Sequence, residues 1–113
     1  MQPRDERILE HIVDYCEDIQ DALDLIERSY DRFIADKQSQ YSIAFSILQI
    51  GELVGKLSET LKASTIQEID WPAVKGMRNI IVHDYGVVRL SIVWNVANDD
   101  IPSLKAFCEA HLK

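Results

Sequence analysis

Residues 43–61 read IAFSILQIGELVGKLSETL, and their apolar positions return at intervals of four and three residues. The main stripe consists of Ile43, Ile47, Ile50, Val54, Leu57 and Leu61. This period keeps one face of an α-helix apolar, so it predicts a helix over residues 40–62. A second apolar side consists of Tyr41, Ala44, Phe45 and Leu48. It predicts that this helix is the centre of a bundle or also meets another subunit. Gly51 and Gly55 either permit a close helix contact or are simply tolerated.

The same spacing precedes this segment. It predicts a long amphipathic helix over residues 4–29, followed by a polar connector over residues 31–39. Its stripe consists of Ile8, Ile12, Tyr15, Ile19, Ala22 and Ile26.

Two further helices follow. Asp70 is placed as an N-cap with Pro72 just inside, which predicts a third helix that ends near Gly86. Ser91 is expected to cap a fourth helix, which Pro102 should kink or split. The stripe of this last helix consists of Trp94, Ala97, Ile101, Leu104 and Cys108.

The whole pattern predicts an all-α fold. Four helices with short connections favour an antiparallel four-helix bundle in which residues 1–113 form a single domain. The composition, 47% hydrophobic and 27% charged, is typical of a soluble globular protein. Charges run through the first thirty residues and interrupt every long apolar run, so we expect a cytoplasmic protein without membrane association.

The charge balance opposes general nucleic-acid binding. The net charge is −7, whereas non-specific binding needs a basic surface that neutralises phosphates. A local basic patch is still compatible with this total, because Lys75, Arg78 and Arg89 lie close in sequence, with Lys56 and Lys62 as further candidates. From charge alone, the acidic residues indicate a solvated helix face.

Cysteine and histidine spacing argues against a metal site. Cys16 and Cys108 are far apart without a C-x-x-C pattern, so we interpret both as reduced helix residues. None of His11, His83 and His111 follows a glutamate by three residues, as a di-metal bundle would require. We therefore expect neither a metal nor another cofactor.

The most informative polar residues are Arg78, Asn79 and His83. On a helix Asn79 and His83 share a face, so the amide is placed to orient the imidazole. Arg78 and His83 lie about 140° apart around the helix, which predicts a composite site completed by a bend or by a second chain. Taken alone, the pair is also compatible with a structural role. Arg78 would then be a surface charge, and His83 would lie at the C-terminal end of the helix, where it interacts favourably with the helix dipole.

These residue types suffice for metal-independent RNA cleavage. An imidazole can move the 2′-hydroxyl proton, and a guanidinium can stabilise the charge that builds on the phosphorane. Because the reaction needs an acid and a base and one chain offers one suitable histidine, we expect a homodimer. Lys75 and Arg89 flank the motif and are candidate residues for binding the RNA substrate.

Several segments together resemble a known family. The pattern R-x-x-x-x-H ends at His83, and Tyr85 follows it two residues later. The other matching segments are Ile50-Gly51-Glu52, Trp71-Pro72 through Met77-Arg78-Asn79, and Val93-Trp94 through Ile101-Pro102. From Arg4 to about Leu112 the chain resembles the HEPN superfamily, and specifically its HepT-like branch.

This resemblance implies an activity and partners. HepT-like proteins are all-α homodimeric ribonuclease toxins, neutralised by an MntA-type nucleotidyltransferase antitoxin. By the resemblance, Arg78 and His83 are catalytic, Asn79 supports them, and Tyr85 is the site of AMPylation by the partner.

Two other interpretations remain open at this point. One is a non-catalytic HEPN-type binding module that serves the nucleotidyltransferase as a substrate-binding or regulatory partner, with Arg78 and Tyr85 holding a nucleotide phosphate. The intact motif favours the enzyme, because a scaffold has no chemical need for a titrating histidine. The other is a purely structural bundle, which leaves Arg78 and His83 without a purpose.

Overall fold

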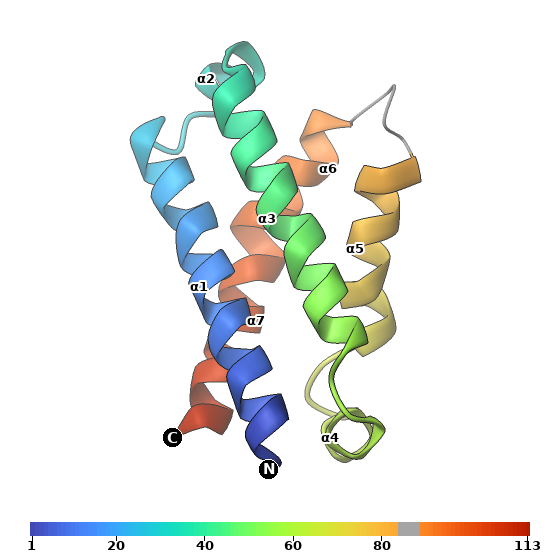
Figure 1. The fold of residues 1–113 in the computed structure, drawn as a ribbon. Helices are drawn as coiled ribbons and strands as arrows, with labels where there is room; N and C mark the ends of the chain where they lie inside the picture. Colours follow the sequence, from blue (N-terminus) through green and yellow to red (C-terminus); the bar gives the residue numbers. More distant parts are fainter. Residues whose placement is uncertain (84–88) are drawn as a thin grey trace.

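The structure of the protein is a computed structural model that describes residues 1–83 and 89–113, but not the side chains of residues 80–83. All regular elements of these residues are helical. In chain order they are α1 (Pro3–Leu25), α2 (Tyr30–Ala35), α3 (Lys37–Gly55), α4 (Glu59–Ser64), α5 (Trp71–His83), α6 (Leu90–Asn95), the π-helical turn η1 (Val96–Asp100) and α7 (Ile101–Leu112). Four long rods, namely α1, α3, α5 and the run from α6 to α7, alternate in direction (Figure 1). The predicted all-α antiparallel four-helix bundle is confirmed.

The predicted apolar stripes form the core. Ile12 and Ile19 of α1 are fully buried, as are Ile43 and Ile50 of α3. Helix α1 packs against α3 and α7, while α5 packs against α3. Helix α3 is therefore the central helix of the bundle, as one of the two sequence interpretations proposed. Within the described residues, no helix combines the length and apolar character needed to cross a membrane.

Helix α1 ends earlier than predicted. It stops at Leu25 rather than residue 29, because Glu27 and Arg28 adopt left-handed φ angles of 56° and 53°. The N–H of Arg28 donates to the carbonyl of Leu23 at 2.8 Å and closes the helix end. The chain is thereby turned toward α2.

The predicted connector over residues 31–39 is wrong in part, since it contains helix α2. The hydroxyl of Ser29 accepts a hydrogen bond from the Arg32 N–H at 3.3 Å and caps this short helix. Phe33 is fully buried, with its ring centroid 5.3 Å from that of Trp94. Tyr30 of α2 also packs on Trp94, with ring centroids 5.4 Å apart. Tertiary packing of these aromatic side chains stabilises a helix too short to form alone.

The predicted helix over residues 40–62 is divided in two. Helix α3 ends at Gly55, and Ser58 begins α4 by accepting a hydrogen bond from the Leu61 N–H at 3.1 Å. The Ser58 N–H and hydroxyl both donate to the buried carboxylate of Asp5, at 2.9 and 2.6 Å. This network fixes the break by satisfying the polar groups at the start of α4.

The last rod is split as predicted but begins earlier. Its first helical residue is Leu90 and its N-cap is Arg89, so the predicted cap at Ser91 is wrong. The π-helical turn η1 lies directly before α7, whose second residue is Pro102. Proline lacks an N–H and its ring disturbs the preceding turn, which accounts for the change of helix type at this point.

Candidate active site

Helix α5 carries the motif and begins where the sequence predicts. The carboxylate of Asp70 accepts a hydrogen bond from the Ala73 N–H at 3.1 Å, as an N-cap does. The indole N–H of Trp71 donates to the buried hydroxyl of Thr65 at 2.9 Å. These contacts fix the start of the helix relative to the core.

Gly51 sets the distance between α5 and α3. A Cβ atom built on Gly51 would lie 2.6 Å from the Cβ of Arg78, closer than real Cβ contacts come. A side chain at position 51 would therefore force the two helices apart. A Cβ on Gly55 meets nothing within 4 Å, so only the first glycine of the pair is required for close contact.

The guanidinium of Arg78 is held by neighbours on two helices. Its Nε donates to the carboxylate of Glu52 on α3, and its Nη1 donates to Oδ1 of Asn79 at 3.4 Å. Arginine has five N–H donors in a fixed planar fork. With two of these engaged, the others remain available to an oxyanion such as a phosphate.

Two other predicted residues cannot be placed as side chains. His83 is the last residue of α5, but its side chain lies outside the described set, as does the expected contact between Asn79 and His83. Tyr85 and the predicted helix end at Gly86 lie wholly outside the described residues. By helical register, Asn79 lies between Arg78 and His83, about 100° from the first and 40° from the second.

A shallow cavity of about 330 Å³ surrounds Arg78 in the groove between α3 and α5. Its lining residues are Gly51, Glu52, Gly55, Lys56, Lys75 and Arg78. The structure thus brings the predicted substrate-binding residue Lys75 next to Arg78 and adds Lys56. Arg89, the other predicted substrate-binding residue, is exposed before α6 and does not line this cavity.

The cavity is basic although the chain is acidic. Three cationic side chains and one carboxylate line it, whereas the whole sequence carries a net charge of −7. An anionic ligand is therefore favoured here over most of the surface.

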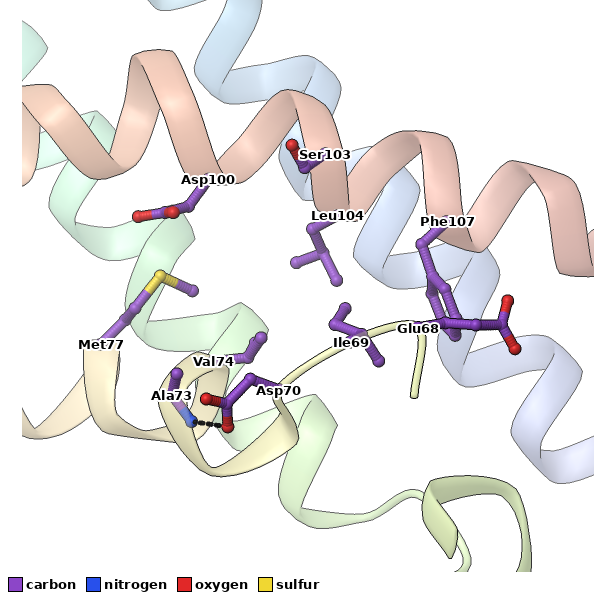
Figure 2. Close-up of a pocket in the computed structure, with 10 residues that line it drawn as sticks. All are labelled: Glu68, Ile69, Asp70, Ala73, Val74, Met77, Asp100, Ser103, Leu104 and Phe107. Carbon is purple, nitrogen blue, oxygen red and sulfur yellow. Dashed lines mark hydrogen bonds between the residues drawn. The ribbon is translucent and has the colours of Figure 1, made fainter. Parts of the chain in front are cut away.

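A different face of α5 borders a cavity of opposite character. This cavity of about 290 Å³ lies between α5 and the η1–α7 rod, with Met77, Leu104 and Phe107 among its apolar lining (Figure 2). The carboxylates that line it belong to Glu68, Asp70 and Asp100. These acids disfavour a phosphate, so the groove on the α3 side is the better candidate for RNA.

The two cysteines lie away from the site. Both Cys16 and Cys108 are free and fully buried in the core, which confirms their interpretation as reduced helix residues. Burial raises the pKa of each thiol to about 12. Neither is therefore a nucleophile near neutral pH. No group of three or more His, Cys, Asp and Glu side chains suited to a metal ion occurs among the described residues.

Comparison with known proteins identifies the family. Residues 12–111 match the family described as "Ribonuclease HepT-like". The chain belongs to this HepT-like ribonuclease family. A HepT-like relative from Thermococcus cleftensis, named "Probable ribonuclease HepT", is 33% identical over 97 residues, which cover 81% of this chain and 87% of that protein. A "Putative RNase" from Methanocaldococcus jannaschii is 30% identical over 114 aligned residues, covering 100% of this chain and 92% of the relative.

Another relative, a "Putative RNase" from Caldanaerobacter subterraneus, is 31% identical over 101 residues, covering 86% of this chain and 84% of the relative. No solved structure matches the chain at a significant level. The predicted family and enzyme class are confirmed.

The structure adds two residues that the sequence interpretation had left without a role. In the sequence, Glu52 is part of one resembling segment, and Lys56 is one of several basic residues. The signal in the sequence was their spacing, since Glu52 and Lys56 are four residues apart, the interval that brings side chains to one side of a helix. What the sequence lacked was the register between α3 and α5.

Proposed function

We propose that this HepT-like protein is a metal-independent endoribonuclease and the toxin of a toxin–antitoxin pair. The observation that carries the proposal is the guanidinium of Arg78, held by Glu52 and Asn79 in a basic groove with donors left for a phosphate. A preorganised donor of this kind is what an anionic transition state requires.

The proposed reaction is a transesterification within the RNA strand. His83 removes the proton of a 2′-hydroxyl, and the 2′-oxygen attacks the adjacent phosphorus atom. The bond between phosphorus and the 5′-oxygen breaks, and this oxygen leaves with a proton from the partner subunit's His83. Arg78 stabilises the negative charge of the phosphorane, and Asn79 helps to hold the guanidinium. The products are a 2′,3′-cyclic phosphate and a free 5′-hydroxyl.

A homodimer is supported by an exposed stripe on α3. Tyr41 and Phe45 are 68% and 55% exposed, although large apolar side chains are usually covered. By helical register they share a face with Leu48 and Glu52, so the stripe leads directly to the carboxylate that holds Arg78. A second copy packed on this stripe would lie beside the site. Sedimentation at micromolar concentration should therefore give about twice the 13.0 kDa chain mass.

Control by a nucleotidyltransferase completes the proposal. The phenol oxygen of Tyr85 attacks the α-phosphorus of ATP, and pyrophosphate leaves. The attached AMP adds negative charge and bulk that repel an RNA phosphate. Incubation with an MntA-type nucleotidyltransferase and ATP should add one AMP by intact mass, and Tyr85→Phe should abolish the adduct. An adduct that leaves RNA cleavage unchanged would contradict this mode of control.

The direct test of the activity uses purified protein in excess EDTA. It should cleave RNA, leave DNA intact and produce 2′,3′-cyclic ends. Arg78→Ala and His83→Ala should each lower the rate by about 10²-fold or more. If the protein binds RNA but does not cleave it, the non-catalytic binding module becomes the better account. The same holds if any cleavage proceeds at an unchanged rate in both variants.

A further inference from the structure

The groove between α3 and α5 contains two layers of charged side chains. The first layer consists of Glu52 and Arg78, and the second, the lysine layer, consists of Lys56 and Lys75. Lys56 is the C-cap residue of α3, four residues after Glu52, and Lys75 lies three residues before Arg78 on α5. Because α3 and α5 run in opposite directions, both lysines lie toward the same end of the groove, near α4 (Figure 1). The offset along the helix axes is about 5 Å, from 1.5 Å per residue.

The lysine layer carries the unbalanced positive charge of the groove. The carboxylate of Glu52 is taken up by Arg78, whereas neither Lys56 nor Lys75 forms an ion pair with a described side chain. Three other basic side chains are paired with acids, in the pairs Arg28–Asp24, Arg32–Glu27 and Lys62–Glu59. The two lysines are thus the groove's available anion-binding groups besides the free donors of Arg78.

An apolar cavity continues from this layer. Lys75 also lines a neighbouring cavity of about 410 Å³ between α4 and the start of α5. Its apolar lining consists of Val54, Ala63, Ile66, Trp71 and Pro72, and the paired side chains of Glu59 and Lys62 also line it. Ile66 is 63% exposed, which leaves an apolar surface directly beside a cation. A cation next to an apolar surface suits a nucleotide, whose phosphate is charged and whose base has an apolar face.

We infer that Lys56 and Lys75 bind the RNA phosphate next to the scissile one, and that the base attached to it packs against Ile66 and Pro72. The spacing between the two layers is comparable to the step between neighbouring phosphates of one strand, with Arg78 on the first phosphate and the lysines on the second. This inference rests on the proposed ribonuclease function and gives its substrate a path along the groove. The enzyme then needs at least three nucleotides for full activity.

The test compares a dinucleotide, which has only the scissile phosphate, with trinucleotides extended on the 5′ or the 3′ side. For the parent protein, the extension on one of the two sides should raise kcat/KM, mainly by lowering KM. In Lys56→Gln and Lys75→Gln the advantage of that trinucleotide should fall about tenfold, the scale of losing a hydrogen bond to a charged group. The matched control is Lys37→Gln, which removes the same charge at the opposite end of α3 and should keep the advantage.

The base contact is tested with a second substrate. Ile66→Ser should lower kcat/KM about threefold to tenfold for the intact trinucleotide. It should have no effect on a trinucleotide that is abasic at the added position. Equal losses on both substrates would overturn the base contact.

Binding of a 2′-O-methyl RNA separates this inference from the proposed activity, because such RNA cannot be cleaved. The slope of log affinity against log salt should fall by about 0.7 in each lysine variant, as for one lost phosphate contact on a single strand. An unchanged slope, or an equal change in Lys37→Gln, overturns the phosphate site. If the slopes change as expected but no RNA is cleaved, the phosphate site stands and the proposed ribonuclease function fails.

Discussion

Replacing Gly51 with alanine should separate α5 from α3 and displace Arg78. The new Cβ would lie 2.6 Å from the Cβ of Arg78, whereas ordinary contacts begin at 3.4 Å, so the helices must move by about 0.8 Å. Overpacking of this kind costs about 1–3 kcal/mol of unfolding free energy. Alanine in place of a helical glycine also stabilises by about 1 kcal/mol, which partly hides this cost.

Gly76→Ala is the matched control on α5. A Cβ at position 76 meets nothing within 4 Å, so this variant gains the helix propensity without the clash. The unfolding free energies of the Gly51 and Gly76 variants should therefore differ by about 1–3 kcal/mol, or roughly 4 °C in Tm for each kcal/mol. RNA cleavage should fall by about 10²-fold in Gly51→Ala alone, as expected for a misplacement approaching 1 Å. Equal stability and equal activity of the two variants would refute the close-contact argument.

Three further changes test other contacts. Glu52→Gln should lower kcat about tenfold or more with little change in KM, and Glu52→Asp should restore part of it, because the carboxylate positions Arg78 rather than binding RNA; a loss confined to KM would contradict this. Thr65→Val should cost about 1–3 kcal/mol in urea unfolding, because the buried indole N–H of Trp71 loses its acceptor; an unchanged midpoint would show that the bond is dispensable. Burial raises the pKa of Cys108 from 9.0 to about 12, so its contribution to stability is complete below pH 9 and is lost as the pH rises above it. Between pH 8 and pH 10 the parent should lose about 1.4 kcal/mol more than Cys108→Ala, and parallel losses would contradict the raised pKa.

The sequence predicted the long helices because their apolar period records burial directly. The same property explains why it missed the break after Gly55. Leu57 and Leu61 are both buried, although Leu57 lies between the helices and Leu61 belongs to α4. The spacing of apolar residues thus continued across a gap in the helix, because the period reports which residues face the core and not whether the backbone is continuous. The local signals for the break, Gly55 and Ser58, were present but weaker than the stripe.

Helix α2 was missed for the opposite reason. It is six residues long and buries Phe33, too little to produce a periodic pattern. Its formation depends on the packing of that side chain near Trp94, which is distant in sequence. A contact of this kind is visible only once the chain is folded.

In the candidate site, too, the contacts between residues close in sequence could be predicted, and the contacts between distant residues could not. The spacing of Arg78, Asn79 and His83 is local and can be derived from the sequence. The partner that holds Arg78 is Glu52, 26 residues earlier, and it reaches the guanidinium because Gly51 lets the two helices approach. Glu52 also lies on the exposed face of α3 that begins at Tyr41, so the carboxylate connects the proposed dimer surface to the proposed catalytic arginine. Packing of a second copy on that face would remove water from the Glu52–Arg78 pair and strengthen it, so cleavage should depend on protein concentration in the range where the dimer forms.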